Sequence, residues 1–244
     1  MSLEFSGKAA LITGAAGGIG RATAELLHAR GAGIILGGRD PARLAEIAAT
    51  LPGSRILPLD LIDPARIDAT MAQCGPIDIL AHVAGIYPSA LVAQMSDAFL
   101  DEMIAVNMAG TIRLCRAVTR LMLGQGGGVI VNVSSLAAQK TTPGLSAYAA
   151  TKAAIEAFSK SLAHEVAPLI RVNVVAPGPT LTESVRALVL SDTTGAVASV
   201  TRDIPLGRMA DPSEIAEAIA FLASPRASYI TGAVLHVNGG ALMA

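Results

Sequence analysis

Residues 8–20 read Lys-Ala-Ala-Leu-Ile-Thr-Gly-Ala-Ala-Gly-Gly-Ile-Gly, an apolar run followed by a turn rich in glycine. The apolar run predicts a buried strand from Lys8 to Thr13, and the periodic segment after the turn predicts a helix from Arg21 to Ala29. Gly14, Gly18 and Gly20 lie where the chain must turn sharply between them. We therefore expect a strand that passes through a tight turn directly into a helix.

The same alternation of apolar runs and segments of helical periodicity continues along the chain. Strands covered by helices on both faces of a parallel sheet are buried throughout, so they read as nearly continuous apolar runs. The predicted strands are Lys8 to Thr13, Gly33 to Leu36, Arg55 to Leu59, Ile77 to His82, Val129 to Val133, Arg171 to Ala176 and Ala233 to Val237. The sequence thus predicts an α/β fold with a doubly wound, parallel seven-stranded sheet. No linker or low-complexity stretch divides it, so we expect a single domain over residues 1–244.

Three predicted helices begin with Asp-Pro, at residues 40–41, 63–64 and 211–212. An aspartate at this position accepts hydrogen bonds from unpaired backbone N–H groups, and proline suits the first helical position. Glu214, three residues after Asp211, completes the pattern of a capping box. We interpret the recurring Asp-Pro as helix capping and not as an internal repeat.

The 244 residues carry 18 Lys and Arg against 19 Asp and Glu, without a charge run or a basic stripe. Nucleic acid and anionic membrane surfaces are therefore poor candidate partners. Gly, Pro or a charge interrupts every long apolar stretch, so the sequence predicts neither a transmembrane span nor a secretory signal peptide. Cys74 and Cys115 have no CxxC spacing and no His nearby, which is typical of reduced, packed thiols. We expect a cytoplasmic protein without a metal site.

The glycine turn also suggests a ligand. Its spacing is Gly-x-x-x-Gly-x-Gly over residues 14–20. Glycine lets the backbone approach a pyrophosphate, whose charge is favoured at the helix N-terminus. Any tight strand-to-helix turn favours glycine, but this one follows the first strand of a β/α alternation, where dinucleotides bind. The turn therefore predicts a dinucleotide site.

A second motif, Ser-Ala-Tyr-Ala-Ala-Thr-Lys, places Tyr148 and Lys152 one helical turn apart. At that spacing the side chains share a helix face, so the ammonium can lower the cost of ionising the phenol. Such pairs are more often two solvated neighbours. This pair gains weight from Ser135, thirteen residues before Tyr148, and from Asn107. We interpret Tyr148 as a group that exchanges a proton with an alcohol.

The motifs occur together and in order along the chain. They are the glycine turn, Asp60, His82-Val83-Ala84-Gly85, Asn107, Val131-Asn132-Val133-Ser134-Ser135, Tyr148-x-x-x-Lys152, Pro177-Gly178 and Val237-Asn238-Gly239-Gly240. Over essentially the whole chain this set resembles the short-chain dehydrogenase/reductase (SDR) family. The resemblance implies a dinucleotide-binding and catalytic domain that performs nicotinamide redox chemistry, and it does not specify a substrate.

The resemblance implies four catalytic residues. Tyr148 is the acid/base, Lys152 stabilises its anion and hydrogen-bonds the nicotinamide ribose, and Ser135 donates to the substrate oxygen. Asn107, midway along a helical stretch, holds a proton-relay water near the lysine. Strand alternation and the family spacing favour Ser135 over Ser134. Seen alone, Ser135 and Asn107 are more typical of cap or turn residues.

The resemblance also implies a set of cofactor-binding residues. They are Gly14, Gly18, Ile19, Gly20, Arg39, Asp60, Leu61, Ala84, Gly85, Tyr148, Lys152, Pro177, Gly178, Thr180 and Thr182. NAD-preferring relatives tend to carry an acid where this chain has Gly38, and Arg39 is well shaped for a 2′-phosphate, so NADP is preferred over NAD. Asp40 is an alternative ribose-binding acid, but Pro41 favours a helix cap; Arg39 as a plain surface charge is the other alternative.

One motif departs from the family, which usually reads Asn-Asn-Ala-Gly where this chain reads His82-Val83-Ala84-Gly85. The small Ala84-Gly85 pair leaves room for the adenosine ribose. Loss of both asparagines removes side chains that tie the central strands. His82 lies on an apolar strand with no second ligand nearby, so we expect a hydrogen-bonded structural histidine.

Residues 181–201, poor in charge, are predicted to form a substrate lid. The resemblance implies an oxidoreductase that transfers hydride between NADP(H) and a carbonyl or secondary alcohol, and the charge-poor lid suits a small, mainly apolar ketone or alcohol as its substrate. The alternatives are an NAD-dependent alcohol or diol dehydrogenase, an isomerase or dehydratase with tightly held NAD, and a dinucleotide-binding regulator without turnover. The resemblance also implies a homotetramer that pairs helices 107–123 and 148–166 across a twofold axis.

Overall fold

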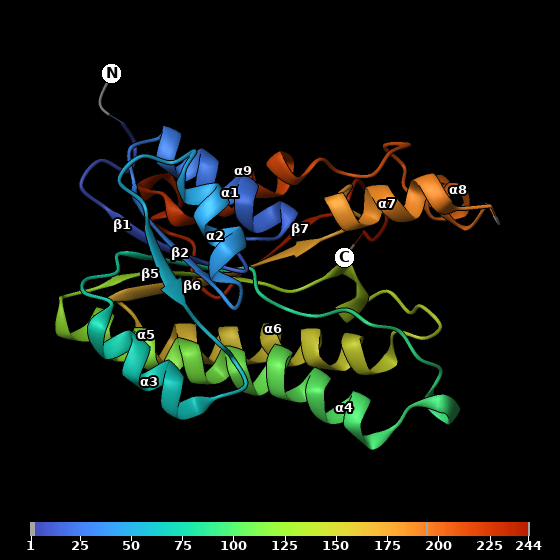
Figure 1. Cartoon of the computed structure of the whole chain (residues 1–244), viewed down its shortest axis with the longest axis horizontal. Coiled ribbons are helices and arrows are strands. Elements are labelled where there is room, and N and C mark those ends of the chain that lie inside the picture. The colour runs from blue at the N-terminus through green and yellow to red at the C-terminus, as the bar shows by residue number, and fades with distance from the viewer. Residues whose placement is uncertain (1–2, 194, 244) are drawn as a thin grey trace.

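The computed structural model describes residues 3–193 and 195–243, and its centre is a parallel sheet (Figure 1). In the described chain seven strands pair in the order β3-β2-β1-β4-β5-β6-β7, and every pair is parallel. The strands are β1 (Ala9–Thr13), β2 (Gly33–Gly38), β3 (Arg55–Pro58), β4 (Ile79–His82), β5 (Gly128–Val133), β6 (Ile170–Pro177) and β7 (Val234–Val237). All seven strand predictions and the doubly wound fold class are confirmed, with ends that differ by one or two residues.

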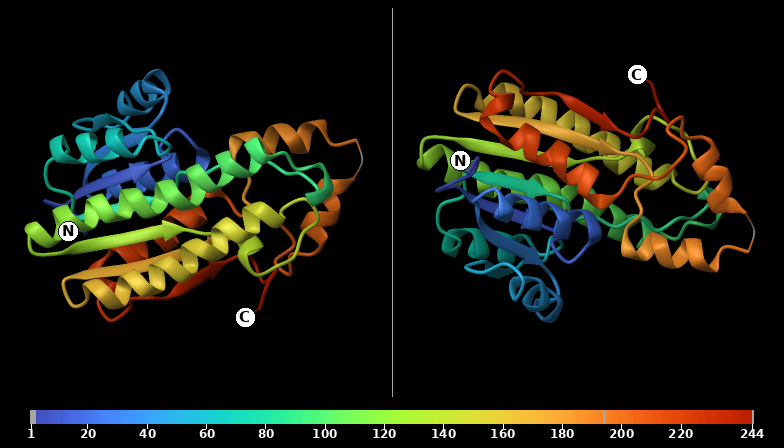
Figure 2. Two further views of the ribbon diagram at one scale, coloured as in Figure 1. Left: turned by 90° about the horizontal axis from the view of Figure 1, so that it is seen from below. Right: turned by 90° about the horizontal axis from the view of Figure 1, so that it is seen from above.

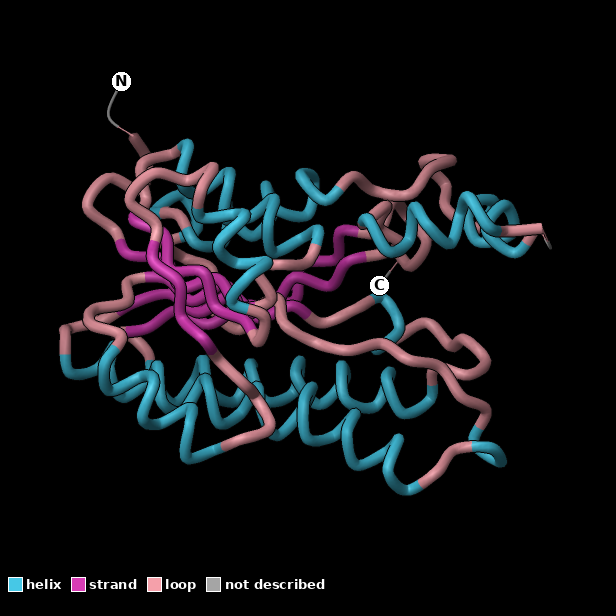
Figure 3. The backbone as a smooth tube through the Cα atoms, viewed as in Figure 1, coloured by secondary structure: helices cyan, strands magenta, loops and turns pink. Residues whose placement is uncertain are grey.

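Helices cover both faces of the sheet, as the tube view shows (Figure 3). One layer consists of α1 (Gly18–Ala29), α2 (Pro41–Ala48) and α9 (Pro212–Ala223). The opposite layer consists of α3 (Pro64–Gln73), α5 (Thr111–Gly124) and α6 (Ser146–Val166). The helices α4 (Asp97–Met103), α7 (Glu183–Ser191) and α8 (Ala196–Arg202) lie toward one end of the molecule, beyond the carboxyl ends of the strands (Figure 2).

Alternation along the strands builds a separate core under each helix layer. On β1, Ile12 packs with Leu27 of α1, while its neighbour Leu11 packs on the other face with Leu114 of α5. All of these side chains are fully buried. Burial of a leucine or isoleucine side chain contributes roughly 1.5–3 kcal/mol, so both faces of each central strand stabilise the sheet.

All three predicted aspartate caps are confirmed. Asp40 accepts from the amides of Ala42 and Arg43 at 3.0 and 3.2 Å, and Asp63 accepts from Arg66 at 3.1 Å. Asp211 and Glu214 form the expected capping box at the start of α9. Each cap fixes where its helix begins and therefore how the preceding loop leaves the sheet.

Two helix predictions differ from the structure at their starts. The first helix opens at Gly18, three residues before Arg21, because the glycine turn is itself its first turn. The helix predicted from Asn107 to Leu123 continues a longer run, in which α4 passes into a π-helix (Ile104–Gly110) and then into α5. Periodicity alone does not distinguish a π-turn from an α-turn, since both present similar side-chain spacing over a few residues.

Both cysteines are free and buried, as predicted. Burial raises the pKa of the Cys115 thiol to about 12 and raises that of Cys74 as well. Among residues 3–193 and 195–243 no group of three His, Cys, Asp or Glu side chains is arranged to hold a metal ion. None of the helices in that described part combines the length and apolarity needed to cross a membrane.

The glycine turn leads to a stability prediction. A Cβ at Gly20 would collide with the Gly14 carbonyl and lie 3.0 Å from the Cα of Ala15. We expect Gly20→Ala to lower the free energy of unfolding by roughly 1–3 kcal/mol, as overpacking does. Gly124→Ala is the control, because a Cβ there meets nothing within 4 Å at the end of α5. Urea unfolding followed by circular dichroism measures both, and equal midpoints for Gly20→Ala and the parent protein would contradict the collision.

Candidate active site

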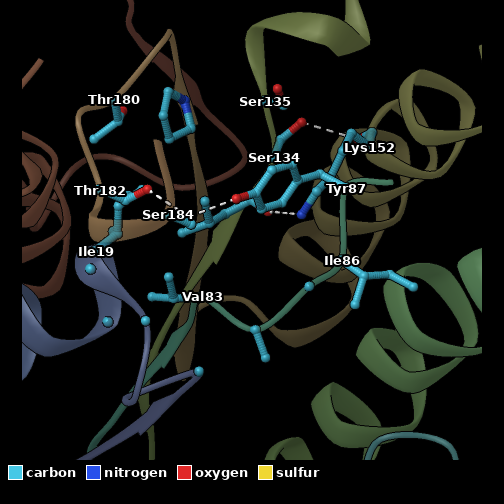
Figure 4. A pocket seen from close by; sticks show the side chains of 18 of the residues that line it. Ile19, Val83, Ile86, Tyr87, Ser134, Ser135, Lys152, Thr180, Thr182 and Ser184 are labelled. Carbon is cyan, nitrogen blue, oxygen red and sulfur yellow. Dashed lines mark hydrogen bonds between the residues drawn. The ribbon is translucent and has the colours of Figure 1, made fainter. Parts of the chain in front are cut away.

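A cavity of about 410 Å³ opens at the carboxyl ends of the central strands (Figure 4). It is lined by the glycine turn, the chain after β4, the end of β5, the start of α6 and the chain after β6. The predicted site residues among its lining are Gly14, Gly18, Ile19, Gly20, Ala84, Gly85, Ser135, Tyr148, Lys152, Pro177, Gly178, Thr180 and Thr182. Residues far apart in the sequence are thus brought to one hollow because parallel strands present all their carboxyl ends at the same edge.

A second cavity of about 150 Å³ lies beside the first, over the carboxyl ends of β1 and β2. Gly14, Ala84 and Gly85 line both cavities. The remaining predicted cofactor residues, Arg39, Asp60 and Leu61, line this second one, which Gly38 also lines. Asn107 lines neither cavity and is only 1% exposed.

The residues shared by the two cavities leave no room for larger side chains, so a dinucleotide could lie against the backbone and extend from one cavity into the other. Gly14 has a φ of +66°, and a Cβ there would lie 2.8 Å from the Cα of Ala84. No side chain caps the start of α1, and no acidic residue occupies its first turn. A pyrophosphate bound at this turn would be held by backbone N–H groups and by the positive end of the helix dipole.

Tyr148 lies in the first turn of α6 and faces the larger cavity. Burial raises the pKa of its phenol, and a hydrogen bond with Ser135 lowers it part of the way back. The Lys152 ammonium lies 5.8 Å from the centre of the Tyr148 ring, and in the protein without a dinucleotide the loss of solvent around the phenol is the largest effect on its pKa. That Lys152 lowers this pKa in the working enzyme stays a prediction.

Lys152 is a buried cation, 5% exposed, one helical turn after Tyr148. Its Nζ donates to the carbonyl of Val133 at 2.9 Å, at the end of β5. Burial lowers the pKa of the ammonium to about 8. The lysine is thus held at a fixed place on the cavity wall and titrates within two units of neutrality.

The two serines after β5 have different surroundings. Ser134 is 2% exposed, and its hydroxyl shares one proton between Glu156 Oε1 at 2.8 Å and the Lys152 carbonyl at 3.1 Å, so it faces α6. Ser135 is partly exposed, lines the cavity, and its Oγ accepts from the amide of Ala137 at 3.1 Å. Both serines line the cavity, but of the two only Ser135 hydrogen-bonds Tyr148, which favours it over Ser134.

Asn107 lies behind the cavity wall, in the π-helix. Its Oδ1 accepts from the amide of Ile86 at 2.8 Å, and its Nδ2 donates to the carbonyl of Ile86 at 2.8 Å and to Thr151 at 3.3 Å. The Asn107 side chain therefore fixes the backbone after β4. A Cβ at Gly85 would lie 3.1 Å from Asn107 Oδ1 and 3.3 Å from Lys152 Nζ, so the two polar groups meet at that glycine.

The threonines after β6 connect the glycine turn to α7. Thr182 caps α7 by accepting from the amide of Val185 at 3.4 Å. Its side chain also lies 3.0 Å from the place where a Cβ of Gly18 would be. Thr180 donates to the carbonyl of Gly178 at 3.0 Å. Thr182 thus sets the start of α7 directly against the turn.

At the second cavity, Asp60 and Arg39 have different environments. Asp60 accepts from the amide of Ile62 at 3.1 Å, which closes a local turn. Arg39 is exposed at the cavity rim, next to Gly38. Asp40 Oδ1 accepts from the amides of Ala42 and Arg43, which favours the helix-cap interpretation of Asp40 over the ribose-binding one.

Tyr87 and Ser184 also line the cavity, and neither is among the predicted site residues. The Tyr87 hydroxyl hydrogen-bonds Ser184 Oγ at 2.8 Å, joining the chain after β4 to α7 across the cavity (Figure 4). Ile86 and Val185 line the same hollow. The available signal was their position in the sequence. Ile86 and Tyr87 follow the His82-Val83-Ala84-Gly85 motif after a strand, and Ser184 lies two residues after Thr182.

Curated relatives match the chain along almost its full length. A family model described as enoyl-(acyl carrier protein) reductase matches residues 14–241. The 3-oxoacyl-(acyl-carrier-protein) reductase FabG of Salmonella typhimurium is 43% identical over 247 residues, which cover 99% of this chain and 100% of that protein. Nodulation protein G of a Rhizobium species is 40% identical over 98% of this chain and 99% of its own.

Solved structures agree with the relatives. A short chain dehydrogenase/reductase family protein is 41% identical, with a TM-score of 0.89 over 97% of this chain and 98% of that chain. A short-chain dehydrogenase/reductase of the glucose/ribitol dehydrogenase type from Brucella melitensis is 37% identical, with a TM-score of 0.92 over the whole of both chains. The chain therefore belongs to the short-chain dehydrogenase/reductase family, and it is an oxidoreductase that uses a nicotinamide dinucleotide to interconvert CH–OH and C=O groups.

Proposed function

We propose that the protein reduces the ketone of a 3-oxoacyl thioester with NADPH. The observation that carries this proposal is an uncharged cavity wall around the proton-donating pair. Apart from Lys152, the residues that line the larger cavity in the described chain are apolar, hydroxylic or glycine. The 3-oxoacyl-(acyl-carrier-protein) reductases that are 43% identical support the same substrate class.

The proton-handling residues have distinct roles in this proposal. The bound dinucleotide supplies the hydride for the carbonyl carbon. Tyr148 gives its proton to the carbonyl oxygen, and Ser135 donates a hydrogen bond to the same oxygen. Lys152 stabilises the phenolate that Tyr148 becomes, and Asn107 holds the backbone beside that lysine. A raised phenol pKa suits this direction, because it keeps Tyr148 protonated at neutral pH.

The dinucleotide would be held along the two cavities. The amides at the start of α1 would hold the pyrophosphate, Asp60 and Leu61 would border the adenosine, and Lys152 and Thr182 would hold the nicotinamide end. NADP is the preferred form because Gly38 offers no carboxylate to the ribose and Arg39 stands at the rim. NAD is the alternative.

The substrate is larger than the small ketone expected from the sequence, because the acyl group of the relatives is carried on a protein. Its acyl chain nevertheless keeps the expected apolar character. A polyol or sugar dehydrogenase is the second candidate, since structures 37% and 31% identical carry the titles glucose/ribitol dehydrogenase and aldohexose dehydrogenase. The apolar side chains of Val83, Ile86 and Val133 in the cavity favour the acyl group.

Residues 181–201 are proposed as the substrate lid, and residue 194 within them lies outside the described residues. Of the described part, α7 and most of α8 project past the sheet edge, with Leu188 and Leu190 exposed. A homotetramer with paired α5 and α6 helices is also a proposal, supported by the exposed Ile112 and Leu123 on α5. Residues 1, 2 and 244 of the expected domain lie outside the described chain.

Replacing the proposed acid tests the mechanism. Tyr148→Phe is expected to keep the fold and the dinucleotide affinity while turnover falls by roughly 10²–10⁴-fold, as for a lost proton-transfer group. In the parent enzyme, the rate of ketone reduction should fall at alkaline pH as the phenol loses its proton. Tyr229→Phe is the matched control, since Tyr229 is fully exposed and should leave turnover unchanged. Normal turnover by Tyr148→Phe would refute the mechanism.

Exchange of two residues tests the dinucleotide preference. Gly38→Asp is sterically allowed, because a Cβ at Gly38 makes only ordinary contacts with Leu44 from 3.4 Å. The double variant Gly38→Asp/Arg39→Ala is expected to lose NADPH affinity by about ten-fold or more, the scale of one charge-assisted hydrogen bond, and to gain NADH affinity. Fluorescence titration measures both affinities, with Arg66→Ala on α3 as control. An unchanged NADPH preference would show that Arg39 is a plain surface charge.

A substrate panel tests the proposed reaction itself. Loss of NADPH absorbance should be fast with 3-oxoacyl thioesters and faster with longer acyl chains, because each buried methylene contributes about 0.8 kcal/mol. Glucose and ribitol, offered with NAD and with NADP, should react slowly or not at all. A higher kcat/KM for a sugar or polyol than for any 3-oxoacyl thioester would replace the proposal with the second candidate.

A further inference from the structure

A row of buried polar side chains crosses three neighbouring strands at the carboxyl edge of the sheet. Thr13 of β1, His82 of β4 and Asn132 of β5 are register partners in adjacent strands. They all point to the face that α5 and α6 cover, and none is more than 2% exposed. Polar groups at this depth require hydrogen bonds, so their partners define what the row does.

The imidazole of His82 makes hydrogen bonds in opposite directions. Its Nδ1 lies 2.6 Å from Thr13 Oγ1, and its Nε2 lies 2.8 Å from Thr111 Oγ1 at the start of α5. The Thr111 hydroxyl also donates to the backbone carbonyl of Asn107 at 2.6 Å. The ring therefore bridges the end of β1 and the π-helix that carries Asn107.

The proton positions in this chain follow from simple counting. A hydroxyl has one proton, and Thr111 gives its proton to the Asn107 carbonyl, so it must accept from His82. Nε2 of His82 therefore carries the ring proton, and Nδ1 accepts from the Thr13 hydroxyl. Thr13 in turn accepts from the amide of Ala84 at 3.3 Å. Burial keeps the ring neutral by lowering its pKa to about 3, with the nearby Lys152 ammonium adding to the effect.

The far end of this chain is the backbone of Asn107. In the π-helix the amide of Thr111 donates to Met108, and the Thr111 hydroxyl reaches the Asn107 carbonyl. The Asn107 side chain then holds both backbone groups of Ile86. His82 is thus joined, through Thr111 and Asn107, to the backbone after β4. In that backbone lies Gly85, beside which Asn107 and Lys152 come together.

We propose that His82 is a positioning residue. Through one directed chain of hydrogen bonds, it holds the π-helix that carries Asn107 against the end of β1, where the glycine turn begins. The chain runs from the Ala84 amide through Thr13, His82 and Thr111 to the Asn107 carbonyl. An imidazole performs this bridging because its two nitrogens face apart, which lets one ring reach hydroxyls on β1 and on α5. Its kinetic consequence rests on the proposed roles of Asn107 and Lys152, whereas its structural consequence does not.

The tautomer is tested on the protein without substrate. Nitrogen-15 NMR of the histidine rings, with the His82 signals identified by their loss in His82→Gln, should show a protonated Nε2 and a bare Nδ1 that persist from mildly acidic to alkaline pH. A protonated Nδ1 or a charged ring at neutral pH would overturn the directed chain.

The positioning is tested by amide exchange and turnover in matched variants. Thr111→Val and His82→Phe should each speed hydrogen exchange of the Ile86 amide and lower kcat by about ten-fold, as for a broken buried hydrogen bond, with little change in KM. Thr111→Ser keeps the hydroxyl and should restore both values. Ser159→Ala is the control, because it breaks the 2.9 Å bond to Asn132 in the same polar row without touching this chain.

Two results separate this inference from the proposed function. Parent-like exchange of the Ile86 amide in Thr111→Val, or an equal change in Ser159→Ala, would overturn the positioning role whatever the substrate is. A parent enzyme that is inactive on every 3-oxoacyl thioester, with the expected tautomer and exchange pattern, would overturn the substrate proposal and support the positioning role.

Discussion

The fold depends on the close approach of two backbones at the centre of the sheet. Gly14 after β1 and Ala84 after β4 come so near that a Cβ at Gly14 would lie 2.8 Å from Ala84. The strand order reverses at this pair, with β2 on one side of β1 and β4 on the other. Connections leave in opposite directions there, so a crevice opens at the carboxyl edge. Both cavities share this contact as their common wall.

Burial determines the electrostatics of the site. Around Lys152 and Tyr148 the loss of water disfavours the charged form of each, which lowers the pKa of one and raises that of the other. The two shifts bring the groups toward the state in which both are neutral. A charge on a bound dinucleotide, or one that develops on a carbonyl oxygen, would therefore change the protonation of Lys152 and Tyr148.

Much of the fold was predictable because its signals are local. Continuous apolar runs gave the seven strands, and Asp-Pro gave three helix starts. The candidate site was predictable where glycine, tyrosine and lysine stand at fixed spacings, since the turn and one helical turn translate spacing directly into position. The π-helix at Asn107, the Tyr87 contact with Ser184 and the direction of the Tyr148 pKa shift were not predictable. Each depends on packing between distant segments, which in the last case removes the water around the phenol.

The lysine buried at the cavity wall links ligand binding to proton uptake. With a pKa of about 8, a fraction of the Lys152 side chains is neutral in mildly alkaline solution. In the proposed complex, an anionic dinucleotide beside Lys152 would bind better to the ammonium form, so its binding would draw a proton from the buffer and its affinity would weaken as the pH rises above 8. The heat of binding consequently contains the ionisation enthalpy of the buffer, and it differs between buffers of equal pH even though the contacts formed are the same.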